Sequence, residues 1–385
     1  MGELRFMTAG ESHGPCLTAI LEGLPAGLLI DMEAVNADLA RRQQGYGRGG
    51  RMKIEKDKAE ILSGVRFGET LGGPITLRVV NRDWENWEER MSVLGKPAGP
   101  KVTAARPGHA DLTGYRKYAR QDIRDILERS SARETAMRVA AGAVCKEFLK
   151  AFGMEVVSHV TEIGGVSVDR EKIDPASIGR GTSELNCYDA EAEERMKSRI
   201  REAKEAGDTL GGVFEVIVRG VPLGLGSHIQ WDRRLDARLS AALMSIQAIK
   251  GVEIGEGFGC ARLPGSRVHD EMYLDDRGQV YRKTNHAGGL EGGMTNGEDL
   301  VLRAAMKPIP TLMKPLNSVD VESRTEVLAC KERSDTCAVS AASVVGEAMT
   351  AFAMAQALCE KFGSDAMVDV LDAFERYEKR VRDTW

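Results

Sequence analysis

The stretch CAVSAASVVGEAMTAFAMAQALCEKF, residues 337–362, decides how the rest of the chain must be arranged. Its pattern predicts a helix that is apolar on nearly all sides, and such a helix is buried in a core. A second long helix, rich in alanine, is expected at 132–151. Strand-like runs with β-branched residues precede and follow these helices, and most end at Gly, Pro or Asn. We therefore expect a core of packed sheets and helices.

The same reading extends along the whole chain. Strands are expected at 4–8, 17–21, 61–65, 75–80, 155–163, 213–218 and 300–306. Helices are expected at 32–42, 132–151, 189–206, 234–249, 337–362 and 367–382. Because no Pro/Ser-rich linker divides the sequence, residues 1–385 are predicted to form a single domain.

Two pairs of similar segments suggest an internal duplication. TLGGPITLRVV, from Thr70, resembles TLGGVFEVIVRG, from Thr209. AILEGLPAGL, from Ala19, resembles VIVRGVPLGL, from Val216. A fold with two similar halves would explain both pairs, and chance matching of Gly-rich strands is the alternative.

Composition excludes several classes of protein. With a net charge of −5 and 5% aromatic residues, the chain does not have the profile of a nucleic-acid or membrane-surface binder. The seven cysteines are an odd, scattered set without a Cys-x-x-Cys pair, as in a reducing compartment. No signal-like stretch and no run of 18 apolar residues is found, so we expect a cytoplasmic protein.

The segment ERSSARETAMRVAAGAV, residues 128–144, marks a helix start. Ser130 or Ser131 is a natural N-cap, and Glu134 stands three residues after Ser131, as in a capping box. Arg129 and Arg133 add positive charge where free N–H groups gather. The segment is therefore either a site for an anion such as phosphate or an ordinary cap with solvated arginines.

A basic, glycine-rich segment runs through residues 41–58, RRQQGYGRGGRMKIEKDK. It holds seven basic and two acidic residues, and its glycines allow close approach to a ligand. GYGRGG fits the pattern G-x-G-x-x-G, but no apolar strand precedes it, so a dinucleotide site is not indicated. A solvated loop and an RNA-binding loop are alternatives to a loop that closes on an anionic small molecule.

Two histidines lie in turns shaped by glycine or proline. His13 lies in GESHG and His109 in RPGHAD, beside acids and arginines, where a side chain can exchange protons near neutral pH. No Cys/His cluster or helical histidine pair is found, so no metal site is predicted. The loops at 285–297 and 306–311 could line a planar ligand. Asp335, in ERSD, would by default cap the helix that follows.

Taken together, these segments resemble the chorismate synthase family over almost the whole chain. Eight motifs occur in the family's order: GESHG, RRQQGYGRGGRMKIE, RPGHAD, ERSSARETAMRVAAGA, GSHIQWDRRLDARL, GGLEGGMTNG, MKPIPT and ERSD. The resemblance implies an α+β fold, a β-α-β sandwich with helices between two mostly antiparallel sheets, and a homotetramer. It implies a lyase that converts 5-enolpyruvylshikimate 3-phosphate to chorismate by anti 1,4-elimination, the last common step towards the aromatic amino acids. The family needs reduced FMN without net redox change.

The resemblance also implies roles for individual residues. His13 matches the histidine near the departing phosphate, His109 the histidine beside the flavin, and Asp335 the aspartate that acts as the ring proton leaves. Positions that match flavin-binding residues are Arg129, Ser130, Ser131, Gln247, Ala248, Gly292, Lys307, Pro308, Ile309, Pro310, Thr311 and Arg333. Positions that match residues meeting the substrate, or NADPH where the family uses it, are Ser12, Arg42, Arg48, Arg51 and Arg133.

The chain departs from the family at two positions. Thr336 replaces the usual proline after Asp335, and Ser340 stands where another proline is common. Because proline suits the first helical turn, the helix start here is expected to be looser. No extra domain is left for NADPH, so we expect FMN to arrive already reduced by a separate reductase. An RNA-binding protein and an NADPH-dependent flavin reductase are the alternative functions.

Overall fold

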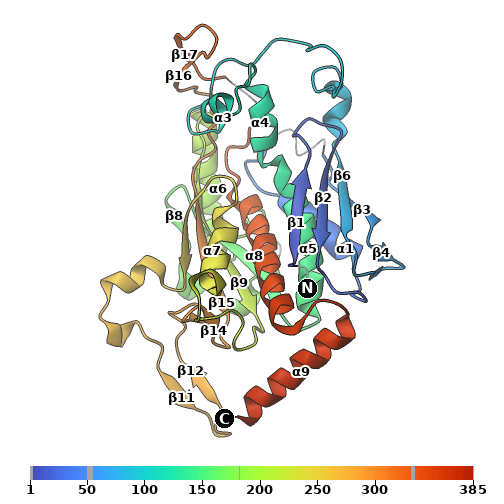
Figure 1. Ribbon diagram of the computed structural model, residues 1–385. Coiled ribbons are helices and arrows are strands. Elements are labelled where there is room, and N and C mark those ends of the chain that lie inside the picture. The colour runs from blue at the N-terminus through green and yellow to red at the C-terminus, as the bar shows by residue number, and fades with distance from the viewer. Residues whose placement is uncertain (1–2, 50–54, 182, 331–333, 385) are drawn as a thin grey trace.

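The computed structural model describes residues 3–49, 55–181, 183–330 and 334–384, and it contains two antiparallel sheets with helices between them (Figure 1). This arrangement confirms the predicted sandwich. The first sheet has the strand order β1-β2-β6-β3, with β1 Arg5–Ala9, β2 Cys16–Glu22, β6 Ile75–Val80 and β3 Ala59–Ser63. The second has the order β10-β15-β9-β7-β8, with β10 Ile249–Ile254, β15 Leu300–Met306, β9 Gly212–Arg219, β7 Glu155–Ile163 and β8 Val166–Ser167.

Four helices form the middle layer. They are α1 Met32–Gln43, α5 Thr135–Lys150, α7 Leu235–Met244 and α8 Val339–Phe362. Helix α5 packs on β2 and β6 of the first sheet, whereas α8 packs on β7 and β9 of the second. The two helices also pack on each other and so join the two sheets through one core, as Figure 1 shows.

Helix α8 is buried on nearly every side, as its sequence predicted. It meets α5 so closely that a Cβ on Gly142 would lie 2.4 Å from the Cβ of Ala348, which only glycine avoids. Length and composition alone would let α8 cross a membrane, but 89% of its most apolar window is buried inside this fold. Its apolar character is therefore explained by its place between the two sheets.

One carboxylate interrupts this apolar helix. Glu347 is fully buried, and both of its oxygens receive hydrogen bonds from Arg41, at 2.6 and 2.8 Å. Ser158 donates at 2.6 Å, and Lys146 completes the pairing. Burial acts to raise the pKa of Glu347, but Lys146 and Arg41 outweigh it and hold that pKa well below its usual value.

This pairing predicts acid sensitivity. Because the pKa of Glu347 is depressed, its contribution to stability is present above the ordinary Glu value of about 4.3 and is lost as the pH falls below it. We expect the urea midpoint of the Glu347→Gln variant to be lower at pH 7 and to fall less steeply below pH 4.5 than that of the unaltered protein. Glu326→Gln, at an exposed position, should leave the pH dependence unchanged. Parallel curves for Glu347→Gln and the unaltered protein would contradict the assignment.

The remaining elements lie around this sandwich. Most helices and strands fall within two or three residues of their predicted bounds, but the helix expected at 234–249 ends at Met244, and β10 follows because it pairs with β15. The other helices are α3 Asp111–Lys117, α4 Arg124–Ser130, α6 Ala190–Glu205 and α9 Met367–Asp383. The short strands are β4 Val65–Arg66, β5 Glu69–Thr70, β11 Met272–Leu274, β12 Val280–Arg282, β13 Leu290–Glu291, β14 Met294–Thr295, β16 Asn317–Val319 and β17 Glu326–Leu328.

The two main sheets share a chain path. In the first sheet β3 lies beside β6, and α1 joins β2 to β3. If the two-residue β8 is left out, the second sheet repeats this path, because β10 lies beside β15 and α7 joins its second strand, β9, to its third, β10. A hydrogen-bond clamp also recurs. The Thr70 hydroxyl donates to Pro25 O and accepts from Leu28 N, and the Thr295 hydroxyl makes the matching bonds with Pro222 and Leu225.

This clamp involves one of the two similar pairs, AILEGLPAGL and VIVRGVPLGL, which both follow second strands. The other pair aligns β6 with β9, which hold different places in their sheets. The duplication therefore stays a prediction.

Candidate functional site

His13 lies in the turn between β1 and β2 and is held on several sides. Its Nδ1 atom lies 3.0 Å from both carboxylate oxygens of Glu128, and its main-chain N–H donates to Glu128 Oε2 at 2.8 Å. The Trp87 ring stacks on the imidazole with centroids 4.0 Å apart. Only 14% of the histidine side chain is exposed. Because Nδ1 is committed to Glu128, proton exchange with a ligand falls to Nε2.

Glu128 belongs to α4 and is itself paired. Its Oε1 accepts a hydrogen bond from Arg124 at 2.9 Å, and the Arg124 guanidinium lies over the Trp87 ring. Burial acts to raise the pKa of Glu128, but hydrogen bonds from His13 and Arg124 outweigh it and lower that pKa. Ser12 is buried beside this pair and donates its N–H to Glu128 O at 3.1 Å. The carboxylate therefore stays ionised beside the imidazole near neutral pH.

A cluster of buried arginines lies next to this turn. Arg42, on α1, donates to Thr135 Oγ1 and Ala132 O, each at 3.0 Å, and its Nη1 lies 3.5 Å from Asp57 Oδ2. Burial, together with nearby Arg133 and Arg48, lowers the pKa of Arg42 to about 10 despite the attraction of Asp57. Asp57, Glu55 and Asp335 balance much of this positive charge, but Arg42 Nη1 is buried without a hydrogen-bond partner among the described residues, so it could donate to an anion there.

Arg133 links the arginine cluster to the His13 turn. Its Nη1 lies 2.8 and 2.6 Å from the two oxygens of Asp57, and its Nε and Nη2 donate to Asn81 Oδ1. Asn81 in turn donates to Gly14 O at 2.7 Å. The predicted ligand-binding residue Arg133 thus also carries a structural role that its place in the sequence did not indicate.

The basic loop is joined to Asp335. Gly49 N donates to Asp335 Oδ1 at 2.6 Å, and Arg48 Nη1 lies 3.0 Å from Asp335 Oδ2. Glycine suits this close approach, because a Cβ on Gly49 would lie 3.2 Å from both Asp335 Oδ1 and Ser334 O. The default reading of Asp335 as a helix cap is wrong, since α8 begins after Ala338 without a side-chain cap. The side chain instead faces the basic loop.

The unusual threonine after Asp335 contributes a bond that proline could not. Thr336 N donates to Gly47 O at 2.9 Å, so the loop is tied to this segment. We expect Thr336→Pro to lose about 0.5–1.5 kcal/mol of loop-holding energy and to raise the substrate KM by up to about tenfold. Ser340→Pro, in the first turn of α8, is the matched control and should change KM little. Equal KM values for Thr336→Pro and the unaltered enzyme would show that the bond does not hold the loop.

His109 has a similar carboxylate partner. Its Nδ1 bonds Asp111 Oδ1 at 2.5 Å, and Asp111 also receives hydrogen bonds from Arg106. Burial acts to raise the pKa of Asp111, but the bonds from His109 and Arg106 hold it far below its usual value. Arg106 Nη1 also donates to Thr311 Oγ1 at 3.2 Å, which places His109 beside the segment at 307–311.

Hydrogen bonds hold the proline-containing segment 307–311 on three sides. Lys307 N donates to Ala248 O at 2.9 Å, and Thr209 Oγ1 donates to Ile309 O at 2.7 Å. Ser334 Oγ donates to Thr311 O at 2.8 Å, so the segment adjoins Asp335. The predicted flavin-binding residues Lys307, Pro308, Ile309, Pro310 and Thr311 thus lie in one segment between Ala248 and Asp335.

The helix start at 128–144 differs from its prediction. Ser130 ends α4 and bonds back to Ile126 O, whereas Ser131 caps a short 3₁₀ turn at Ala132–Glu134 before α5. The capping box is not formed. The Glu134 carboxylate instead accepts from Thr8 Oγ1 at 2.7 Å and from Gln247 Nε2 at 3.1 Å. This bond brings Gln247 to the helix start.

Arg129 lies beside this cap with 42% of its side chain exposed, and it donates to Thr8 O and Gly10 O. It is therefore the more accessible of the two arginines in this segment, since Arg133 is only 3% exposed. Ala248, next to Gln247, has a φ of 69°, which is unusual for a residue with a side chain.

Hydrogen bonds and ion pairs thus connect nearly all the predicted residues that the structure describes. Gly292 is the exception. The hairpin that contains it adjoins Leu235, the first residue of α7, whereas Gln247 follows the last turn of that helix. The ten residues of α7 separate the two by about 15 Å. Arg51 and Arg333 lie outside the described residues, so their predicted roles stay predictions.

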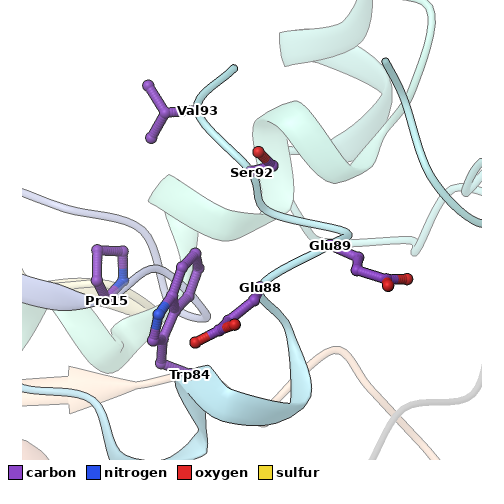
Figure 2. A pocket seen from close by; sticks show the side chains of 6 residues that line it. All are labelled: Pro15, Trp84, Glu88, Glu89, Ser92 and Val93. Carbon is purple, nitrogen blue, oxygen red and sulfur yellow. The ribbon is translucent and has the colours of Figure 1, made fainter. Parts of the chain in front are cut away.

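A shallow surface cavity of about 430 Å³ opens beside the turn that carries His13 (Figure 2). Pro15 and Trp84 face each other across it, and Glu88, Glu89, Ser92 and Val93 line the rest. Its two carboxylates would repel an anionic ligand. The arginine cluster, rather than this cavity, therefore has the charge for phosphate or carboxylate.

Sequence reasoning missed several residues of the site. Glu128 and Asp111 stood inside the quoted motifs, and their place beside a histidine or a buried arginine was the signal that could have found them. Trp87, Asp57 and Asn81 gave no such signal, because their partners lie far away in the chain.

Comparison with known proteins gives one consistent result. A protein-family model described as Chorismate synthase matches residues 4–359. A chorismate synthase of Geobacter sulfurreducens is 61% identical, with 98% of this chain and 99% of that protein covered. One of Aquifex aeolicus is 57% identical, with 98% of each covered. A crystal structure of chorismate synthase superimposes with a TM-score of 0.80 at 47% identity, covering 99% of both chains.

Proposed function

The chain belongs to the chorismate synthase family of lyases, and we propose that it converts 5-enolpyruvylshikimate 3-phosphate to chorismate and phosphate by anti 1,4-elimination. The observation that carries this proposal is the linked network of Arg42, Arg133, His13 and Asp335. The substrate bears a phosphate and two carboxylates, and each needs a charged or hydrogen-bonding partner when it leaves water. The family name places the product in aromatic amino acid biosynthesis.

Different residues of the network are proposed to have different roles. Arg42, Arg48 and Arg133, with Arg51 and Ser12, are proposed to bind the substrate's anionic groups. His13 is proposed to donate its Nε2 proton to the departing phosphate, because Glu128 holds Nδ1. Asp335, held by Gly49 N–H and Arg48, is proposed to act where the ring proton leaves.

Reduced FMN is the proposed cofactor, and residues beside Gln247 fit it. Gln247 Oε1 is buried without a hydrogen-bond partner among the described residues, so it can accept one from a ligand. When bound, reduced FMN would supply electron density to the carbon–oxygen bond that breaks. His109, beside the 307–311 segment, would hold the ring's protonation state. The residues proposed to bind FMN are Arg129, Ser130, Ser131, Gln247, Ala248, Gly292, Lys307, Pro308, Ile309, Pro310, Thr311 and Arg333.

Assembly and location belong to the proposal too. We propose a homotetramer, as the family resemblance implies. We also propose a cytoplasmic location and a separate flavin reductase, with NADPH acting only through that reductase. The alternatives lack support: Arg48 in the basic loop is only 9% exposed, which leaves it little access to RNA.

An anaerobic assay tests the proposal. Dithionite-reduced FMN should support stoichiometric release of phosphate and formation of chorismate, with the flavin still reduced afterwards. NADPH with oxidised FMN should give no product until a flavin reductase is added. No product with reduced FMN would reject the proposed reaction, and product with NADPH alone would reject the separate reductase.

A further inference from the structure

We propose that Glu128 is the positioning residue for His13. Its ionised carboxylate holds the imidazole in the orientation in which His13 serves as the proton donor of the site. This inference rests on the proposed function of His13 and names the residue through which the turn is controlled. The same carboxylate binds the histidine twice, once at Nδ1 and once at the main-chain N–H. Rotation of the imidazole would break the first of these contacts, and movement of the turn would break the second.

The packing around this pair restricts the imidazole further. Trp87 covers one ring face at a centroid distance of 4.0 Å and 30° between planes. Arg124 Nη1 binds Glu128 Oε1 at 2.9 Å, and the Arg124 Cζ atom lies 5.0 Å from the centre of the Trp87 ring. Glu128 thus binds Arg124, Arg124 lies over Trp87, and Trp87 stacks on His13. The Glu128 carboxylate joins the two ends of this series, because it binds both Arg124 and His13.

The charge of Glu128 bears on the proton that His13 would donate. In the described part of the chain, the charged groups near the ring are Glu128 and Arg124 from α4, Arg90 across Trp87, and Glu11 in the same turn. Glu128 contacts the imidazole directly, with both carboxylate oxygens 3.0 Å from Nδ1. The carboxylate therefore fixes which nitrogen of the ring is turned toward α4.

The second histidine shows that this arrangement is not a general consequence of a carboxylate partner. His109 bonds Asp111, but the Arg106 guanidinium also lies 3.1 Å from its Nδ1 and 3.4 Å from its Nε2. At His13, by contrast, the arginine contacts the carboxylate. The two histidines therefore have different hydrogen-bonding surroundings, and the imidazole of His13 is held by Glu128.

When His13 gives its Nε2 proton to the departing phosphate, the carbon–oxygen bond breaks and its electron pair leaves with that oxygen. The electron pair of the ring C–H bond, whose proton leaves at Asp335, shifts the substrate's double bonds and replaces the pair lost from carbon. The imidazole keeps its other proton on Nδ1, hydrogen-bonded to Glu128, and solvent then returns the Nε2 proton. Loss of the carboxylate should therefore affect turnover rather than substrate binding.

The test uses the full chain with reduced FMN and compares Glu128→Gln with Glu128→Asp. Glutamine keeps the shape but removes the charge that holds the imidazole, so kcat should fall by about tenfold or more, with KM within about twofold. Aspartate should recover part of the lost kcat. Glu60→Gln, whose carboxylate pairs with Arg78 on the exposed side of the first sheet, is the matched control.

A second measurement keeps the inference testable without turnover. In ¹⁵N-histidine-labelled protein, the His13 signals should show a proton fixed on Nδ1 in the unaltered chain and a mixture of tautomers in Glu128→Ala. Equal kcat values for Glu128→Gln and the unaltered enzyme, or unchanged tautomer signals, would overturn the role of Glu128. If the unaltered chain makes no chorismate while the tautomer result holds, the proposed function fails and the positioning of His13 stands.

Discussion

Replacing His13 with alanine is expected to lower kcat by about 10²–10⁴-fold with saturating substrate and reduced FMN, the usual contribution of a positioned proton donor. The fold should survive for a specific reason. Glu128 is buried, but the variant leaves it two partners, Arg124 and the main-chain N–H of residue 13, at 2.9 and 2.8 Å. No buried carboxylate is left alone, so the thermal midpoint should hardly change.

The matched control is His269→Ala, because His269 is exposed and lies in the 257–286 segment away from the site. Anaerobic chorismate formation from pH 6 to 8 is the measurement. If His13→Ala kept full activity throughout that range, while His269→Ala behaved in the same way, the proton-donor role of His13 would have to be abandoned.

Local sequence patterns predicted the scaffold well because the scaffold depends on periodicity. Strands β6, β7 and β15 have their predicted bounds, and α8 is buried as its apolar surface requires. The β-α-β sandwich was predicted from the family resemblance and not from periodicity. Periodicity failed at 245–249, which was predicted to continue a helix. Residues 245–248 instead form a turn, and β10 begins at Ile249, where β15 offers a hydrogen-bonding partner.

The site was less predictable because its partners come from distant parts of the chain. The spacing of Ser131 and Glu134 fits a capping box, yet Glu134 turns to Thr8 and Gln247, more than 100 residues away in each case. Asp335 stood where a cap belongs and instead receives the basic loop. The sequence shows which polar side chains stand at these helix starts, but only the fold shows which groups they bind.

Arg133 is the residue for which this difference matters most, and Arg133→Ala is expected to destabilise the protein by about 3–5 kcal/mol. Its side chain is 3% exposed, and the Asp57 and Glu55 carboxylates beside it are fully buried. Removing the guanidinium would leave Asp57 with Arg42 Nη1, at 3.5 Å, as its nearest described cation. It would also release Asn81, which holds the His13 turn through Gly14 O, so activity should fall with stability.

A double-variant cycle measured by urea denaturation separates this structural role from ligand binding. Arg133→Ala combined with Asp57→Asn should recover much of the lost stability, because the buried charge disappears with its partner. Arg133→Lys should be intermediate, since lysine supplies a charge but cannot bind Asp57 and Asn81 at once. If Arg133→Ala kept the stability of the unaltered protein and lost only substrate affinity in a titration, Arg133 would serve the ligand alone. We expect both losses, because the same guanidinium joins the arginine cluster to the turn that carries His13.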